Sequence, residues 1–463
     1  MVSLETRSPL ILHEELESFI YPTRISEADQ LTLRSNPLDE LDCINHYCFG
    51  GLRNMNRGFL VLTVNDHSPG DETLFLAVQL KGTESMIVHF DWSPLAAELV
   101  KARAARLGLA DRIIWVGGDL QNIHPLFTDG SNDSSETRVG DCVAAKLGHS
   151  QFDYIRCCGA LDRVRDFEAT FDAMLMFLKP NGALGMSCLG DYGREPYRQM
   201  QTVAGVLGSD KPGLQEEVDR LKELFVFLPQ RNWTHLAYDN LLPEIRSMKD
   251  DAFAAHFVRK DINSWTVPKI YDLLRRKNLD LANFSRKTRM YYQPWFAQKA
   301  PELFELVRSL PLEDTQAISE IVWNTIEEHI FWATREKSAR VDPNNWGNVL
   351  FFNPVPQNQK KWRERFLEMK AETPQLTVTL TPDEKYTIDL PWNLQIHRMI
   401  ELIDGQRTFK EILTTIREEM ETPLGMEEIL KSCGSFLVAA EFEDIILMRH
   451  RNAPVLPFTA STF

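Results

Sequence analysis

The sequence predicts a doubly wound α/β fold, in which helices cover both faces of a mostly parallel sheet. Three observations support this prediction. Short apolar runs rich in β-branched residues alternate with stretches of helical periodicity between residues 59 and 190. The stretches between the runs are long enough for crossover helices, which implies parallel pairing of the strands that they connect. Acidic residues directly follow several runs, at the carboxyl ends of strands where ligands of such sheets bind.

The periodicity of each segment predicts its place in this core. The strands are expected at residues 59–64, 86–90, 113–116, 152–157 and 183–188. The helices between them are expected at 72–80, at 94–107, and in a segment that runs through 178. A polar stretch rich in Ser, Asp and Gly at 128–148 interrupts the pattern, and we interpret it as an exposed loop.

The rest of the chain is predicted to add three parts to the core at 59–194. Residues 1–58 are expected to form a mainly helical leader that caps the sheet edge or folds over its ligand. A helical insertion is expected at about 195–260. Two late strands, at about 279–284 and 329–334, extend this α/β domain, which begins at 59, to 337 in this interpretation.

The last part, residues 338–463, has a different pattern. Its sequence predicts a hairpin, three helices and a final strand, at 376–380 with 386–390, at 392–402, 408–421 and 426–436, and at 442–448. Two helices joined by a tight turn, a third helix and a strand are typical of a small α+β module of the winged-helix kind.

Composition restricts the partners that the chain can have. The formal net charge is -15, with 66 acidic and 51 basic residues, which argues against nucleic acid as a partner. No apolar run approaches the roughly 20 residues that span a bilayer, and the first residues lack the layout of a secretion signal. Seven cysteines without regular spacing fit reduced, buried thiols. We therefore expect a cytoplasmic protein without a membrane segment.

Two aspartates at strand ends are the best candidates for cofactor binding. Asp91 ends the second strand, 21 positions after Gly70, where an acid can accept hydrogen bonds from both ribose hydroxyls of an adenosine. Asp119 follows the third strand and can accept a hydrogen bond from the amino group of adenine. Either residue alone would fit a helix N-cap or an acidic turn equally well. Their position at the ends of adjacent strands favours a cofactor.

The order of these segments resembles the class I S-adenosylmethionine-dependent methyltransferases. The likeness covers residues 59–194, and the chain to 337 more loosely; it rests on VLTVNDHSPGDETLFLAVQL, IVHFDWSPLAAELVKARAARLGLADRIIWVGGDL and the phrase FLKPNGALGMS. The resemblance implies a Rossmann-like methyltransferase sheet and S-adenosylmethionine as cofactor. It also implies ribose binding by Asp91. The cofactor-binding residues expected from it are Asn65, Ser68, Gly70, Asp71, Asp91, Trp92, Asp119, Leu120, Cys157 and Gly159.

The first loop departs from the pattern of this family. Its members usually carry Gly-x-Gly-x-Gly followed by an acid, whereas residues 65–71 read NDHSPGD and keep only Gly70. The missing glycines matter because they let the backbone approach the cofactor and adopt positive φ. Asn and Asp tolerate such φ values better than most residues. The altered loop motivates an alternative hypothesis, a catalytically silent methyltransferase-like scaffold or partner subunit.

Methyl transfer requires positioning and exclusion of water more than a dedicated base. The candidate catalytic residues near the strand ends are Tyr192 and Asp162. Tyr192 fits packing under a glycine turn equally well, and Asp162-Arg163 stand where relatives often carry paired histidines. The cysteines and histidines lack zinc-ligand spacing, so no metal is expected. A nicotinamide-dependent oxidoreductase is disfavoured, because a lone Gly70 is not a dinucleotide fingerprint.

The acceptor of the methyl group is inferred from the C-terminal module. The phrase LIDGQRTFKEI at 402–412 faintly resembles small winged-helix domains of peptide-modifying systems. We therefore expect a protein or peptide side chain as acceptor. A packing or dimerisation role for the module is the alternative, and both a homodimer and a hetero-oligomer remain open.

Overall fold

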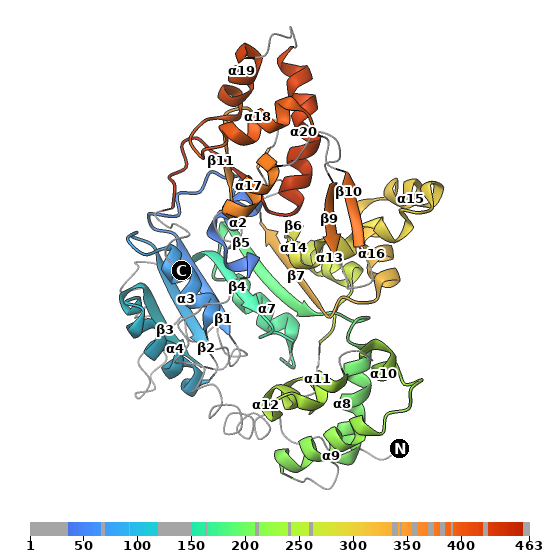
Figure 1. Ribbon diagram of the computed structural model, residues 1–463. Helices are drawn as coiled ribbons and strands as arrows, with labels where there is room; N and C mark the ends of the chain where they lie inside the picture. The colour runs from blue at the N-terminus through green and yellow to red at the C-terminus, as the bar shows by residue number, and fades with distance from the viewer. Residues whose placement is uncertain are drawn as a thin grey trace.

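Seven strands form one sheet at the centre of the structure, in the order β3-β2-β1-β4-β5-β7-β6 (Figure 1). Neighbours among β1 to β5 pair in parallel, whereas β7 runs antiparallel to both β5 and β6. The predicted fold class, a doubly wound Rossmann-like sheet, is confirmed. The strands are β1 (Leu60–Asn65), β2 (Met86–Asp91), β3 (Ile113–Gly117), β4 (Phe152–Cys158), β5 (Leu178–Leu189), β6 (Asp280–Phe284) and β7 (Glu328–Thr334).

This computed structural model describes most of the chain with gaps. The described residues are 36–65, 70–91, 93–118, 151–162, 164–208, 213–238, 242–258, 263–335, 341–342, 345–353, 359–368, 375–379, 385–389, 392–419 and 425–456. The stretch at 128–148, predicted as an exposed loop, and the first 35 residues of the leader lie outside them. None of the helices within these ranges has the length and apolar character needed to cross a membrane.

Helices cover both faces of the sheet, and each face has its own apolar core. On one face, α2 (Leu41–Cys48), α3 (Asp71–Gln79) and α4 (Pro94–Arg106) pack on side chains such as Val61, Ile87 and Tyr154. On the other, α7 (Phe167–Leu175) and α13 (Val267–Arg276) pack on side chains such as Leu62, Val88 and Ile155. The alternation of β-strand side chains between the two faces produces this division.

The helices begin where the sequence provides caps. Ser93 accepts a hydrogen bond from Ala96 N at 3.1 Å at the start of α4, and Asp166 caps α7 in the same way. One boundary was predicted wrongly, because α7 ends at Leu175 and Leu178 already pairs with Phe152 as part of β5. Pro180 disfavours a helical backbone at Lys179, which fits the extended conformation of this part of β5.

Gly70 begins α3 with φ +78°, and a Cβ at this position would overlap the methyl groups of Val100 on α4. Gly82 has nearly the same φ, +84°, but open space around it. We expect Gly82→Ala to cost about 1 kcal/mol of folding stability, from the left-handed backbone alone. Gly70→Ala should cost about 2 kcal/mol more, from overpacking against Val100. Urea unfolding of the two variants measures this difference, and equal losses would contradict the packing role.

A helical segment follows β5 directly and has a separate core. It lies beyond the carboxyl end of β5 (Figure 1) and buries aromatic side chains such as Phe225, Phe253 and Phe257 against each other. The last part of the insertion predicted at about 195–260 consists of short helical pieces. The elements are α8 (Glu195–Leu207), α9 (Leu214–Val226), α10 (Trp233–Tyr238), α11 (Leu242–Ser247), α12 (Asp250–Phe253) and the π-helical η4 (Ala254–Val258).

Short elements connect these parts of the chain. One 3-10 turn precedes α2, a second precedes β3, and the other connecting helices lie between β6 and β7. They are η1 (Pro37–Asp39), η2 (Ala110–Arg112), α14 (Arg286–Arg289), η5 (Met290–Tyr292), η6 (Pro294–Ala297), α15 (Pro301–Arg308) and α16 (Leu312–Trp323).

The C-terminal module has its own apolar core around its helices. Thr408 and Glu411 cap α19 reciprocally: Thr408 N donates to Glu411 Oε2 at 2.7 Å, and Glu411 N donates to Thr408 Oγ1 at 3.2 Å. The hairpin β9–β10 and the antiparallel pair β8–β11 are separate sheets. The elements are β8 (Asn348–Phe352), α17 (Gln359–Glu368), β9 (Gln375–Thr379), β10 (Lys385–Asp389), α18 (Leu394–Leu402), α19 (Phe409–Glu419), α20 (Met426–Phe442) and β11 (Ile446–His450).

The final strand lies later than predicted, because α20 continues to Phe442 and β11 begins only at Ile446. Asp444 makes the turn between them with φ +53°. Asp is one of the few non-glycine residues that adopt this conformation with ease. The structure gives no test of the winged-helix likeness, which stays a prediction.

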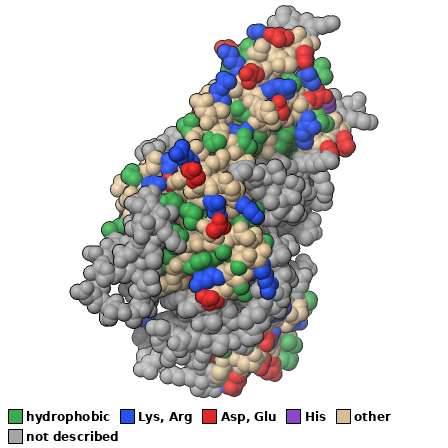
Figure 2. Space-filling view, turned by 90° about the vertical axis from the view of Figure 1, so that its left-hand side faces the viewer, with side chains coloured by type: hydrophobic (Ala, Val, Ile, Leu, Met, Phe, Trp, Pro, Cys, Tyr) green, Lys and Arg blue, Asp and Glu red, His purple; other side chains and the backbone are tan. Residues whose placement is uncertain are grey.

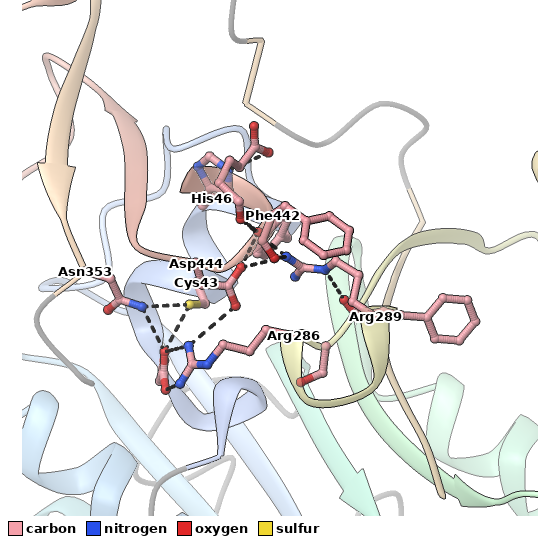
Figure 3. A network of polar contacts seen from close by, with 12 residues as sticks. Cys43, His46, Arg286, Arg289, Asn353, Phe442 and Asp444 are labelled. Atoms are coloured by element: carbon pink, nitrogen blue, oxygen red, sulfur yellow. Dashed lines mark hydrogen bonds and ion pairs between the residues drawn. The ribbon is translucent and has the colours of Figure 1, made fainter. Parts of the chain in front are cut away.

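A buried polar network joins α2 and the start of α14 to the C-terminal module (Figure 3). Arg286 pairs with Glu40 at 2.7 Å, and Arg289 pairs with Asp444 at 3.0 Å. Tyr47 donates to Asp444 Oδ1 at 2.5 Å, and the Tyr47 ring stacks on Trp332 of β7. Burial of these charges is tolerated because each has an opposite partner. The network thereby ties the module to the central sheet.

Candidate functional site

Polar side chains gather at the carboxyl ends of β1, β2 and β4. In the strand register, Asn65 is opposite Asp91, which is opposite Gly117 of β3. Cys158 ends β4 opposite Ser187 of β5. Because β1 lies between β2 and β4, these residues line one edge of the sheet. Ligands of doubly wound sheets bind at this edge.

The Asp91 carboxylate is completely buried, with one hydrogen bond to its Oδ1 and an imidazole close to its Oδ2. Its Oδ1 accepts a hydrogen bond from Ser93 N at 2.8 Å. Its Oδ2 lies 3.7 Å from Nε2 of His89, which is also completely buried. The carboxylate is therefore fixed at the end of β2, the position at which the sequence predicted ribose binding.

Asn65 lies beside Asp91 at the end of β1, with only 2% of its surface exposed. Its Nδ2 donates to Nδ1 of His89 at 3.1 Å, whereas its buried Oδ1 has no hydrogen-bond partner among the described residues. Buried polar atoms of native proteins are nearly always paired. An acceptor left over next to a buried carboxylate fits a ligand that presents hydroxyl or amino groups, as a nucleoside does.

The other predicted cofactor residues have different surroundings. Asp71 forms an ion pair with Arg103 of α4 at 2.6 Å, and Gly70 packs on α4 as described above. Cys157 is buried in the core on the α7 face. Gly159 follows β4 with φ +71°. Four further predicted residues, Ser68, Trp92, Asp119 and Leu120, lie outside the described residues.

The two candidate catalytic residues lie near the ends of β4 and β5. Asp162 is buried, and its Oδ1 accepts a hydrogen bond from Leu189 N, at the end of β5, at 3.2 Å. Tyr192 lies in the turn after β5 and is 37% exposed. That turn is closely packed, since a Cβ on Gly193 would overlap the backbone of Ile326. The hydrogen bond of Asp162 therefore joins the segment after β4 to the end of β5, whereas the side chain of Tyr192 is exposed enough to contact a ligand.

A buried ion pair that the sequence did not reveal lies on the α3 face of the sheet. Arg156, in the middle of β4, donates from Nε to Asp39 Oδ1 at 3.0 Å. Burial outweighs the attraction of Arg156 and raises the pKa of Asp39 to about 6. The neighbouring carboxylate of Glu72 adds to this increase.

Asp39 is expected to make stability depend on pH. Its folded-state pKa lies above the ordinary 3.8, so the stabilisation by its proton is complete below about pH 4 and is lost as pH rises through about 6. Asp39→Asn removes this titration. The amount by which the free energy of unfolding of Asp39→Asn falls below that of the wild type should therefore shrink by about 2 kcal/mol between pH 4 and pH 7. Urea unfolding of both proteins across this range measures the deficit, and a constant difference would contradict the shift.

Two further observations concern possible metal ligands and the charge of the surface. Within the part of the chain that the structure describes, no group of three or more His, Cys, Asp or Glu side chains is placed to hold a metal ion. Figure 2 shows one face of the molecule, on which the described Lys and Arg side chains are interspersed with Asp and Glu. This face presents mixed charge, whereas nucleic-acid sites are strongly basic.

Comparison with known proteins gives one distant relative by sequence. No family model matches the chain. An uncharacterized protein of Synechococcus sp., syc1184_c, is 22% identical over 270 residues, which are 58% of this chain and 59% of that protein. The match therefore spans less than two thirds of the relative's length.

Comparison of structures extends over much more of the chain. PKMT2 from Rickettsia typhi in complex with AdoHcy matches with a TM-score of 0.56 and 14% identity, over 89% of this chain and 75% of that one. A second structure of PKMT2 matches with a TM-score of 0.52 and 12% identity, over 94% and 76%. At this level of identity the likeness shows the fold. The chain has the Rossmann-like fold of the class I methyltransferases, with the strand order given above.

Proposed function

We propose that the protein is an S-adenosylmethionine-dependent methyltransferase. The observation that carries this proposal is the pair of buried polar side chains, Asn65 and Asp91, at the carboxyl ends of adjacent parallel strands. A methyltransferase fold supplies the setting for that pair. The structure solved with AdoHcy is a matching neighbour, and it supports the same class of ligand for this chain.

The residues at the sheet edge would each bind a different part of the cofactor. Asp91 would accept hydrogen bonds from the ribose hydroxyls, and the Oδ1 of Asn65 would accept one from a neighbouring donor group. When bound, the cofactor supplies a methyl group activated on a sulfonium. The protein then has to align the acceptor with that methyl group and exclude water. Tyr192, exposed after β5, is the proposed contact to the acceptor.

We further propose a protein or peptide side chain as the acceptor. The helical segment after β5 supports this, because it exposes large apolar side chains beyond the carboxyl end of that strand. They are Val226, Phe227, Trp233 and Leu236, of which Phe227 is 73% exposed. Exposed apolar patches mark interaction sites, and aromatic side chains such as Phe227 and Trp233 are enriched in protein interfaces.

Calorimetric titration with S-adenosylmethionine and S-adenosylhomocysteine tests the proposal, with NAD as control. We expect micromolar binding of the first two and none of NAD. Binding of neither by a folded protein would overturn the proposal and favour the silent scaffold. Incubation of a cell extract with S-adenosylmethionine carrying a labelled methyl group tests the acceptor. We expect label in protein, and label only in small molecules would contradict the acceptor class.

A further inference from the structure

We infer that His89 is a positioning residue, which orients the Asp91 carboxylate for a ribose and takes over part of the role of the missing glycine loop. This inference rests on the proposed function, since Asp91 has to be a cofactor ligand. His89 lies two residues before Asp91 on β2 and points to the same face of the sheet. Nothing in the apolar packing of that face requires an imidazole.

The hydrogen bonds of His89 fix its tautomer. Nδ1 lies 2.8 Å from Oγ1 of Thr73 on α3 and 3.1 Å from Nδ2 of Asn65. Both neighbours can donate, and the amide nitrogen can only donate. Nδ1 is therefore the acceptor, and the ring proton is on Nε2. Thr63 of β1 extends this series of hydrogen bonds, because its Oγ1 lies 2.8 Å from Oγ1 of Thr73.

The proton on Nε2 faces Asp91 Oδ2 across 3.7 Å. Nε2 makes no hydrogen bond among the described residues, so its donor is available to the carboxylate. The ring itself is held against the edge of Trp115, with 5.1 Å between ring centres. Ser93 N holds the other oxygen of Asp91. The hydrogen bond to Oδ1 and the imidazole beside Oδ2 together restrict the orientation of the carboxylate.

This arrangement explains how the altered first loop is compatible with binding. A glycine-rich loop binds through its backbone, and residues 65–71 keep one glycine of that pattern. In this chain the buried side chains of Thr63, Thr73, His89 and Asn65 connect β1, α3 and β2 directly. A carboxylate that is already oriented loses little freedom when the ligand binds. These buried side chains thus take over part of the role that the backbone of a glycine-rich loop has in the family.

Two substitutions separate the roles of the two ring nitrogens. His89→Asn keeps a polar group near Nδ1 and loses the donor to Asp91, whereas His89→Gln keeps a donor near Nε2. We expect the Asn variant to bind S-adenosylhomocysteine about ten-fold more weakly than the wild type, and the Gln variant within about two-fold. Calorimetry measures both affinities, and a thermal melt establishes that each variant is folded.

Other variants keep the inference testable if His89→Asn fails to fold. Thr73→Val removes a donor to Nδ1 without changing side-chain size, and it should weaken binding several-fold. His46→Asn serves as a matched control, because His46 is buried and hydrogen-bonded in α2; it should lower the melting temperature and leave affinity unchanged. Equal affinities of the wild type, His89→Asn and Thr73→Val would overturn the inference. A wild type that does not bind would instead refute the proposed function.

Discussion

Replacement of Asp91 by alanine is expected to weaken the binding of S-adenosylhomocysteine at least about 100-fold, which is close to 3 kcal/mol. The carboxylate is buried and can accept two charge-assisted hydrogen bonds from a ribose, each contributing about 1.5–3 kcal/mol. Loss of both leaves the ribose hydroxyls without partners in the site. Isothermal calorimetry of the folded variant measures the change.

A matched variant distinguishes this effect from a general change in charge. Asp111 lies in η2, before β3, with 73% of its side chain exposed. Asp111→Ala removes the same charge at the amino end of the neighbouring strand β3, away from the proposed site, and should bind as the wild type does. If Asp91→Ala also binds with unchanged affinity, Asp91 is not a cofactor ligand, and the ribose position has to be sought elsewhere.

Removal of the Asp444 charge is expected to destabilise the protein by about 3 kcal/mol. Asp444→Asn keeps the shape of the side chain and its tolerance of φ +53°. It also keeps an oxygen that can accept the hydrogen bond from Tyr47. The change leaves the Arg289 guanidinium buried without the anion that balances it, and a broken buried ion pair typically costs about 3–5 kcal/mol. The shift of the urea unfolding curve measures the loss.

An exposed ion pair provides the comparison for this prediction. Asp272 pairs with Arg276 on the surface of α13 at 3.1 Å, and both side chains are at least half exposed. Asp272→Asn should cost less than about 0.5 kcal/mol, because solvent screens such pairs. Similar small losses in the two variants would mean that the network around Asp444 contributes no more than a surface pair.

The sheet was predictable because its signals are local. Each strand from β1 to β5 is a short apolar run, and Asp91 directly follows one of them. The order of alternating strands and helices then implies parallel pairing. Boundaries were less accurate: α7 ends at Leu175, before the predicted residue 178, and Asp444 makes the turn that follows α20.

The supporting residues of the site were not predictable from local patterns. The Asp39–Arg156 pair joins residues 117 positions apart, and no periodicity links them. His89 looks like any polar residue inside a strand, and its role depends on Thr73 from the next helix. The β8–β11 pair likewise joins distant segments. Contacts of this kind arise from the three-dimensional fold, and a single sequence contains no record of them.

The contact between α2 and the C-terminal module has a consequence for the order of folding. His46 hydrogen-bonds Met448 across 402 positions of sequence, so this contact cannot form until Met448 has left the ribosome. During synthesis the side of α2 that contacts β11 stays uncovered, while the parallel strands already assemble. Contacts that span such long separations also slow the final step of folding. The last helix and strand thus complete the same side of the molecule on which the described chain begins.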